Sequence, residues 1–308
     1  MATLLIQDAV FRRHRVPPGH PERPERLAAI EAALAAERFA GLLRQGAVKA
    51  DPGLAALAHS EAYIAEIAAM VPADGIAPIE ADTFLGPESF DVALYAVGSA
   101  CAAVDAVMTD EAANAFVAAR PPGHHAEADT AMGFCLFNNA AIAARHAQKT
   151  HGAERVAIVD WDVHHGNGTQ AIFWSDRSVL YGSTHQMPLY PGTGAASERG
   201  AGNIVNAPLA AGAETAEFTE AMTQAIFPAI EAFRPDLIII SAGFDAHWRD
   251  PLGGLNLKED DFTWATEAVM AIASRHCGGR IVSLLEGGYD LTGLADSTAA
   301  HVAALMTA

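Results

Sequence analysis

The residue types and spacing around position 162 predict a metal site. Asp162 and His164 are two residues apart directly after an apolar run, so in an extended segment both side chains point to the same side and reach one ion. Asp245 follows another apolar run and provides a third ligand. Three protein ligands with one open position describe a catalytic metal site. Such a donor set suits Zn²⁺, and also Fe²⁺, Co²⁺ or Mn²⁺.

Two adjacent histidines predict the proton chemistry beside such a metal. His124 and His125 follow Pro-Pro-Gly, a stretch that restricts the backbone and orients both rings. One ring would act as a general base and the other as an electrostatic group. A carboxylate partner such as Asp160 favours imidazolium, whereas an amide partner such as Asn167 does not. The ring paired with the amide is therefore the better proton shuttle near neutral pH.

Aromatic residues next to glycines are candidates for the substrate channel. Tyr289 follows two glycines, and a phenol that faces the metal would donate to a developing oxyanion. Phe134, which follows Gly133, and Tyr190 would wall an apolar tunnel. Both rings suit a core position nearly as well.

Together these groups predict hydrolysis of a carbonyl compound by activated water. The sequence contains no serine or cysteine nucleophile elbow and no glycine-rich phosphate loop of either common type. This disfavours a covalent hydrolase, a kinase and a dehydrogenase.

The elements that position these residues alternate along the chain. Short apolar runs predict strands at 3–7, 115–119, 155–160, 178–183, 203–206, 236–241 and 280–285. Segments of helical period lie at 24–36, 60–69, 90–108, 137–149, 215–233, 258–275 and 291–305. Such alternation predicts an α/β fold, one open parallel sheet covered by helices. The polar clusters follow predicted strands, so they converge on one rim of the sheet. No repeat or linker divides the chain, and we expect a single domain over residues 1–308.

Composition excludes several classes of protein. The 308 residues are 51% hydrophobic and include only three cysteines, which fits reduced thiols and a cytoplasmic location. The net charge of −18 disfavours direct nucleic-acid binding. It favours solubility first, and attraction of cationic substrates second. The N-terminus lacks the features of a signal peptide, and the apolar run 237–242 is too short to span a bilayer, so we expect no membrane partner.

The ordered motifs RPPGHHA, GFCLFNN, DWDVHHGNGTQ, YPGTG, SAGFDAH, DPLGG and EGGYDL resemble the zinc-dependent histone deacetylase and acetylpolyamine amidohydrolase family. The segment GHPERPERL is similar to the first active-site loop of that family, and the match runs from about residue 6 to residue 294. Asn167 in HHGNG, together with DPLGG, is closer to the class II branch than to class I. The resemblance implies an arginase-like α/β fold with an eight-stranded parallel sheet.

The resemblance also implies roles for individual residues. It makes Asp162, His164 and Asp245 zinc ligands, His125 the general base and acid, and His124 with Asp160 the electrostatic pair. Tyr289 polarises the amide carbonyl. A structural potassium ion is implied at Asp160, Asp162, His164, Ser183 and Thr184. Substrate-binding positions are Gly133, Phe134, Tyr190, Leu252 and Asp82, of which Asp82 matches an aspartate that grips the substrate backbone.

The substrate implied by the resemblance is an N-acetylated amine. Polyamine-selective relatives carry an acidic gatekeeper where this chain has Leu252, which favours acetyl-lysine or another N-acyl amine, whereas the charge of −18 favours polyamines. An arginase-like manganese hydrolase, a non-catalytic acyl-amine binding protein and an enzyme acting on a related amide or thioester are the alternatives. Loops from a partner subunit narrow the tunnel in some relatives, so a homo-oligomer is a further possibility.

Overall fold

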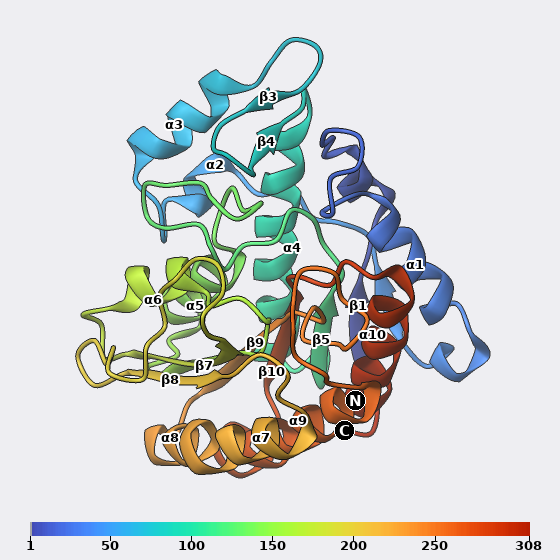
Figure 1. The fold of residues 1–308 in the computed structure, drawn as a ribbon. Coiled ribbons are helices and arrows are strands. Elements are labelled where there is room, and N and C mark those ends of the chain that lie inside the picture. The colour runs from blue at the N-terminus through green and yellow to red at the C-terminus, as the bar shows by residue number, and fades with distance from the viewer. Residues whose placement is uncertain (1) are drawn as a thin grey trace.

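The centre of the fold is one sheet of eight parallel strands, in the computed structural model that describes residues 2–308 (Figure 1). The strand order is β2-β1-β5-β10-β9-β6-β7-β8. The strands are β1 (Thr3–Ile6), β2 (Leu43–Gln45), β5 (Asn114–Val117), β6 (Val156–Asp160), β7 (Val179–Gln186), β8 (Ile204–Leu209), β9 (Leu237–Ala242) and β10 (Ile281–Leu285). Every pairing in this sheet is parallel, so the predicted α/β class with an eight-stranded parallel sheet is confirmed.

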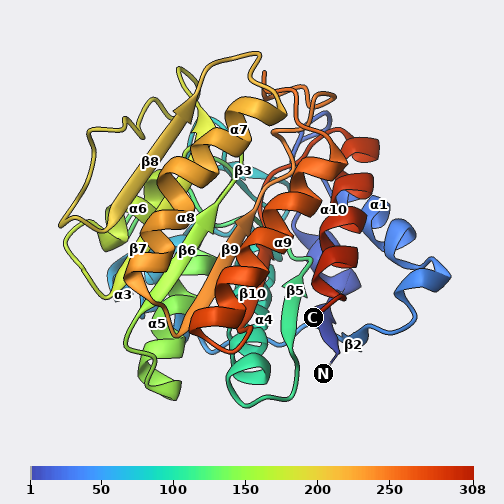
Figure 2. The same cartoon turned by 90° about the horizontal axis from the view of Figure 1, so that it is seen from below.

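Helices cover both faces of the sheet. They are α1 (Glu25–Leu34), α2 (Pro52–Ala55), α3 (Glu61–Met70), α4 (Ser89–Met108), α5 (Asn139–His151), α6 (Asn167–Phe173), α7 (Thr215–Ala221), α8 (Phe227–Phe233), α9 (Glu259–His276) and α10 (Leu291–Leu305). Figure 2 shows α7 to α10 in front of the sheet, with α4 and α5 behind it. Both faces of the central strands are therefore removed from water.

The strand sequences reflect this double coverage. All six residues of β9 are buried, and its run of Leu and Ile shows no polar alternation, as expected for a strand inside a parallel sheet. The pattern predicted seven strands and missed β2. That strand has three residues, all exposed, at the edge of the sheet, so it carries no apolar signal.

One predicted helix is divided in the structure. The segment 215–233 runs as α7, a π-helical turn at Met222–Ile226, and α8 without a break. Pro228 lies in the first turn of α8 and has no N–H to donate to the preceding turn. A wider turn before a proline relieves this conflict and keeps the helix axis continuous.

Helix α4 is the apolar centre of one helical layer. Its 20 residues are long and apolar enough to cross a membrane, but 67% of the most apolar window is buried inside the protein. The helix packs on α5, β5 and β10. Its hydrophobicity is thus accounted for by core packing.

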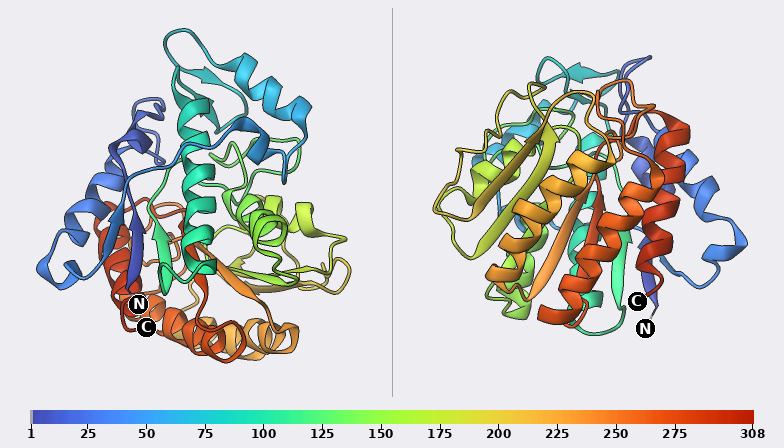
Figure 3. Two further views of the ribbon diagram at one scale, coloured as in Figure 1. Left: turned by 180° about the vertical axis from the view of Figure 1, so that it is seen from behind. Right: turned by 60° about the horizontal axis from the view of Figure 1, so that its bottom comes forward.

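A small additional layer lies over the carboxyl ends of the strands. It contains α2, α3 and the hairpin of β3 (Ala77–Pro78) and β4 (Phe84–Leu85), which Figures 1 and 3 show above the sheet. Tyr63 and Ile67 of α3 share an apolar cluster with Leu85 and Phe137. This cluster fixes the turn between β3 and β4.

Gly98 is predicted to be intolerant of a side chain. A Cβ there would lie 2.2 Å from the carbonyl oxygen of Val48 and 2.6 Å from the amide nitrogen of Ala50. Gly98→Ala should lower the free energy of unfolding by about 1–3 kcal/mol, because overpacking outweighs the gain of about 1 kcal/mol in helix propensity. Urea unfolding measures this. Gly41→Ala, whose Cβ meets only the end of Met306 at 3.5 Å, is the control. Equal stability of the two variants would contradict the packing argument.

Candidate active site

The candidate active site forms where four adjacent strands end. Strands β5, β10, β9 and β6 are neighbours in the sheet. The histidine pair follows β5, Asp162 and His164 follow β6, Asp245 follows β9, and Tyr289 follows β10. Parallel neighbours end at one edge, so four segments far apart in the sequence meet there.

Asp162, His164 and Asp245 converge on one point. The Nδ1 atom of His164 lies 3.1 Å from Asp162 Oδ1 and 3.1 Å from Asp245 Oδ2. The potential ligand atoms of the three residues all lie within 4.8 Å of one another, and all three residues are buried. Two carboxylate oxygens and one imidazole nitrogen at these separations fit a small divalent cation.

Gly287 lies so close to these carboxylates that its position has no room for a side chain. A Cβ on Gly287 would lie 2.1 Å from Asp245 Oδ2 and 2.6 Å from Asp162 Oδ2. Gly287 N instead donates to Asp162 Oδ2 at 2.8 Å, and Val163 N donates to Asp245 Oδ1 at 2.8 Å. These bonds fix the orientation of the carboxylates, as hydrogen bonds to the ligands of a metal site commonly do.

The electrostatics of the triad also suit a cation. Burial and the negative charge of Asp162 raise the pKa of Asp245. Two carboxylates this close in a buried site repel each other when both are ionised. A divalent ion would remove that repulsion, and the residues present therefore fit a metal centre.

The histidine pair has the two partners predicted from the sequence. His124 Nδ1 lies 3.0 Å from Asp160 Oδ2, and His125 Nδ1 lies 2.8 Å from Asn167 Oδ1. Because the amide oxygen is an acceptor, His125 carries its proton on Nδ1 and keeps the lone pair on Nε2. The two rings are 4.0 Å apart between centroids.

Their charges differ because their surroundings differ. Burial opposes the charged form of His124, but the carboxylates of Asp162, Asp160 and Glu286 outweigh burial and raise its pKa well above the ordinary value. Burial and the charge of His124 lower the pKa of His125 well below the ordinary value. Near neutral pH the pair therefore holds one imidazolium and one neutral imidazole.

Tyr289 packs against a buried cluster of charged side chains, Arg26, Glu22 and Arg120. The guanidinium of Arg26 lies 4.9 Å from the centroid of the Tyr289 ring. Arg26 also donates to the carbonyl oxygens of Gly288 and Glu286, each at 2.6 Å, and to Glu22 at 3.0 Å. Arg120 donates to the same Glu22 carboxylate. This cluster fixes the turn that carries the phenol.

A cavity of about 250 Å³ adjoins the triad. All five residues predicted to bind substrate line it, and so do the triad histidine, the amide-paired histidine and the candidate phenol. The lining residues are Asp82, His125, Gly133, Phe134, His164, Leu189, Tyr190, Leu252 and Tyr289. Leu189 is the one member that sequence reasoning did not indicate.

Hydrogen bonds and ring packing shape this cavity. Gly133 N donates to Asp82 Oδ1 at 3.1 Å, which ties the hairpin turn to the segment before Phe134. The Tyr190 ring packs edge-on to His125, with 5.1 Å between centroids. Asp250 Oδ2 accepts from Tyr289 N at 2.6 Å, and its Oδ1 accepts from Leu252 N at 3.0 Å. The cavity thus has walls from several loops joined to one another.

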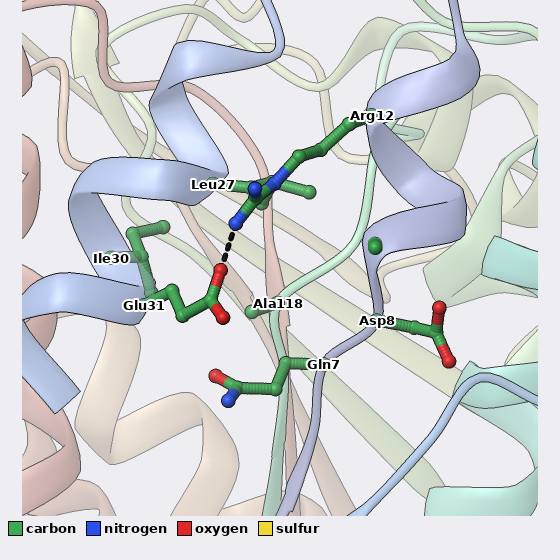
Figure 4. Close-up of a pocket in the computed structure, with 8 residues that line it drawn as sticks. Gln7, Asp8, Arg12, Leu27, Ile30, Glu31 and Ala118 are labelled. Atoms are coloured by element: carbon green, nitrogen blue, oxygen red, sulfur yellow. Dashed lines mark hydrogen bonds and ion pairs between the residues drawn. The ribbon is translucent and has the colours of Figure 1, made fainter. Parts of the chain in front are cut away.

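A second cavity, of about 230 Å³, lies beside α1 and the ends of β1 and β5 (Figure 4). Arg12 and Glu31 form an ion pair across it, next to Leu27, Ile30 and Gln7. Its lining has neither histidine nor cysteine and brings no set of metal ligands together. We therefore place the chemistry in the first cavity.

A family model described as the histone deacetylase domain matches residues 20–305. The chain belongs to the histone deacetylase family. A probable deacetylase of Archaeoglobus fulgidus is 40% identical, with 99% of this chain and 86% of the relative covered. A histone deacetylase-like amidohydrolase of Pseudomonas aeruginosa is 41% identical, with 88% of this chain and 73% of the relative covered. The crystal structure of the HDA15 HD domain superposes with a TM-score of 0.92 at 36% identity, covering 99% of this chain and 88% of that one.

The predicted family is confirmed. The protein is a deacetylase-family amide hydrolase, and the norm in this family is zinc dependence.

Some residues of this deacetylase site were not predicted. Glu286 Oε2 accepts from Gly123 N at 2.6 Å and from His124 N at 3.1 Å, and so joins two loops. Tyr181 donates to Asp160 at 3.0 Å. Glu22 and Arg26 lie in the segment similar to the first active-site loop, and that likeness was the available signal. Tyr181 belongs to an ordinary apolar strand and gives none.

Gly287→Ala tests the metal centre directly. The new methyl group would displace the carboxylates of Asp162 and Asp245, so we expect loss of bound metal and of deacetylation with a largely intact fold. Metal analysis of dialysed protein and circular dichroism measure the two effects. Gly41→Ala is again the control and should keep its metal. A Gly287→Ala variant with full metal content would show that these carboxylates do not hold the ion.

Proposed function

We propose that this enzyme hydrolyses the acetyl amide of an N-acetylated amine with zinc as its metal, and that acetyl-lysine in a peptide is the preferred substrate. The convergence of Asp162, His164 and Asp245 beside a cavity that His125 and Tyr289 also line carries this proposal. Zinc bound by the three ligands would polarise the acetyl carbonyl and lower the pKa of the attacking water.

His125 is the proton carrier in this proposal. Its Nδ1–H is engaged by Asn167, which leaves the Nε2 lone pair to take a proton from the attacking water. The same nitrogen then returns the proton to the leaving amine. His124 keeps its own proton through Asp160 and contributes a fixed positive charge.

Tyr289 stabilises the charge that develops on the acetyl oxygen. Burial and nearby carboxylates raise the pKa of Tyr289 well above its ordinary value, so the phenol remains a donor. A preorganised donor in a site shielded from water strengthens as the oxygen becomes negative.

The cavity walls support acetyl-lysine over an acetylpolyamine. Phe134, Tyr190, Leu189 and Leu252 present apolar surface, which suits the methylene chain of a lysine. Leu252 offers no counter-charge to a second amine. Asp82 lies in the same wall and would accept the backbone N–H of a peptide. An acetylpolyamine is the second candidate, because the net charge of −18 attracts cations.

We also propose a structural potassium ion next to the triad, as the family resemblance implies. Asp160, Asp162, His164, Ser183 and Thr184 are all buried, and Asp160 pairs in register with Ser183 across β6 and β7. Oxygen-rich, buried strand ends suit a hard monovalent cation.

Tyr289→Phe tests the role of the phenol. Removing one oxyanion donor should lower kcat on the order of 10²–10³-fold while metal content stays constant. Tyr63→Phe is the matched control, because its buried hydroxyl donates to Leu136 O at 2.6 Å in the layer with α3. That change should cost about 0.5–1.5 kcal/mol of stability and leave kcat unchanged. Full turnover by Tyr289→Phe would refute the assignment.

Substrate class is tested by comparing kcat/KM for an acetyl-lysine peptide with that for acetylated putrescine and spermidine. We expect the peptide to be preferred, and we expect Leu252→Glu to move the preference toward the polyamines because it adds a counter-charge. Leu252→Met is the control for a change of side chain without charge. Preference for polyamines by the unaltered enzyme would reject acetyl-lysine as the main substrate. Sensitivity to a hydroxamate checks that the activity belongs to this site.

A further inference from the structure

A second cluster of potential metal ligands lies between α4 and α5. Asp105 of α4 faces His146 and His151 of α5. The Nε2 atom of His146 lies 2.6 Å from Asp105 Oδ1, and the Nε2 atom of His151 lies 2.7 Å from the same oxygen. Among residues 2–308, potential metal-ligand atoms of three residues lie within 4.8 Å of one another in two groups. One is this cluster, and the other is Asp162, His164 and Asp245. We propose that Asp105, His146 and His151 bind a divalent transition-metal ion of the zinc type.

The donor set matches that chemistry. Two imidazoles and one carboxylate are ligands that zinc and its neighbours in the first transition series accept. The two histidine side chains are only 12% and 15% exposed, whereas the Asp105 side chain is 49% exposed. The rings are therefore largely enclosed by protein, while solvent reaches the carboxylate.

The histidines are oriented with Nε2 toward the shared point. Thr150 Oγ1 lies 3.3 Å from His146 Nδ1, so the far nitrogen of that ring already has a hydrogen-bond partner. The His146 and His151 rings are 5.9 Å apart between centroids and inclined at 76°. A partner on the far nitrogen is the usual way in which a protein orients a ligating imidazole.

The location favours positive charge. Asp105 is in the last turn of α4, which ends at Met108, and His151 is the last residue of α5. The carboxyl end of a helix carries partial negative charge, and here two such ends are adjacent. The net charge of −18 adds a field that concentrates cations.

This cluster is separate from the catalytic site. Helices α4 and α5 end just before β5 and β6 begin, so the cluster lies at the amino ends of the strands. Asp162, His164 and Asp245 follow the carboxyl ends of β6 and β9, on the opposite side of the molecule from the amino ends of the strands (Figures 1 and 2). An ion here would join α4 to α5 and stabilise the folded state by binding, without taking part in amide hydrolysis.

The experiment counts zinc in the intact chain. Protein equilibrated with a small excess of zinc and then desalted should carry two equivalents by elemental analysis. The double variant His146→Ala and His151→Ala should carry one, and that one should still support deacetylation. Zinc should raise the melting temperature of the one-equivalent form of the unaltered protein and should not raise that of the double variant.

His276→Ala is the matched control. His276 also pairs with a carboxylate, Glu231, but among residues 2–308 no third potential ligand completes a metal-binding group with them. This variant should keep both equivalents. If the double variant does not fold, Asp105→Asn removes the charged ligand from a half-exposed position and should likewise lose one equivalent. One equivalent in the unaltered protein, or two equivalents in a folded variant without these ligands, would overturn the proposal.

Discussion

The structure depends on accommodating several carboxyl groups in a place from which water is excluded. Asp160, Asp162, Asp245, Glu286 and Glu22 are fully or almost fully buried behind or beside the catalytic cavity. Burial of an isolated charge costs far more than a domain's net stability, so each needs a partner. The fold provides partners of two kinds, backbone N–H groups and buried cationic side chains, and the proposed metal ion would be a third for Asp162 and Asp245. The catalytic properties follow from how these partners are distributed.

That distribution explains why two adjacent histidines behave differently. Carboxylates surround His124 and stabilise its positive charge, and this charge in turn disfavours a second one on His125. Asn167 accepts a hydrogen bond without contributing a full charge. The same burial is therefore compatible with an imidazolium and a neutral imidazole whose ring centroids lie 4.0 Å apart. On the other side, Arg26 neutralises Glu22 and supports the turn before Tyr289, so charge neutralisation and positioning of the phenol are performed by one side chain.

Sequence patterns predicted the parts of this site that lie close to strand ends. Strand runs and the polar residues after them are local signals, and parallel pairing then requires that they share an edge. Strand order is not local. β9 and β10 come late in the chain yet insert between β5 and β6, and only the folded packing determines this. For the same reason Arg26, which reaches Gly288 across 262 positions, and Asp105, which faces His146 across 41, were invisible to spacing arguments. The exposed edge strand β2 escaped because exposure removes the apolar pattern.

The two clusters of aspartate and histidine have similar donor atoms but different surroundings, and the surroundings would determine what an ion does at each. At the carboxyl ends of the strands, Asp162 and Asp245 are buried, glycines allow the backbone to approach them, and a cavity adjoins the triad. At the amino ends of the strands, Asp105 is half exposed on a helix. Burial from water and an adjoining cavity suit the first cluster to catalysis. The second cluster lies between two packed helix ends and faces solvent. An ion there would hold α4 and α5 together, with protein on one side and water on the other.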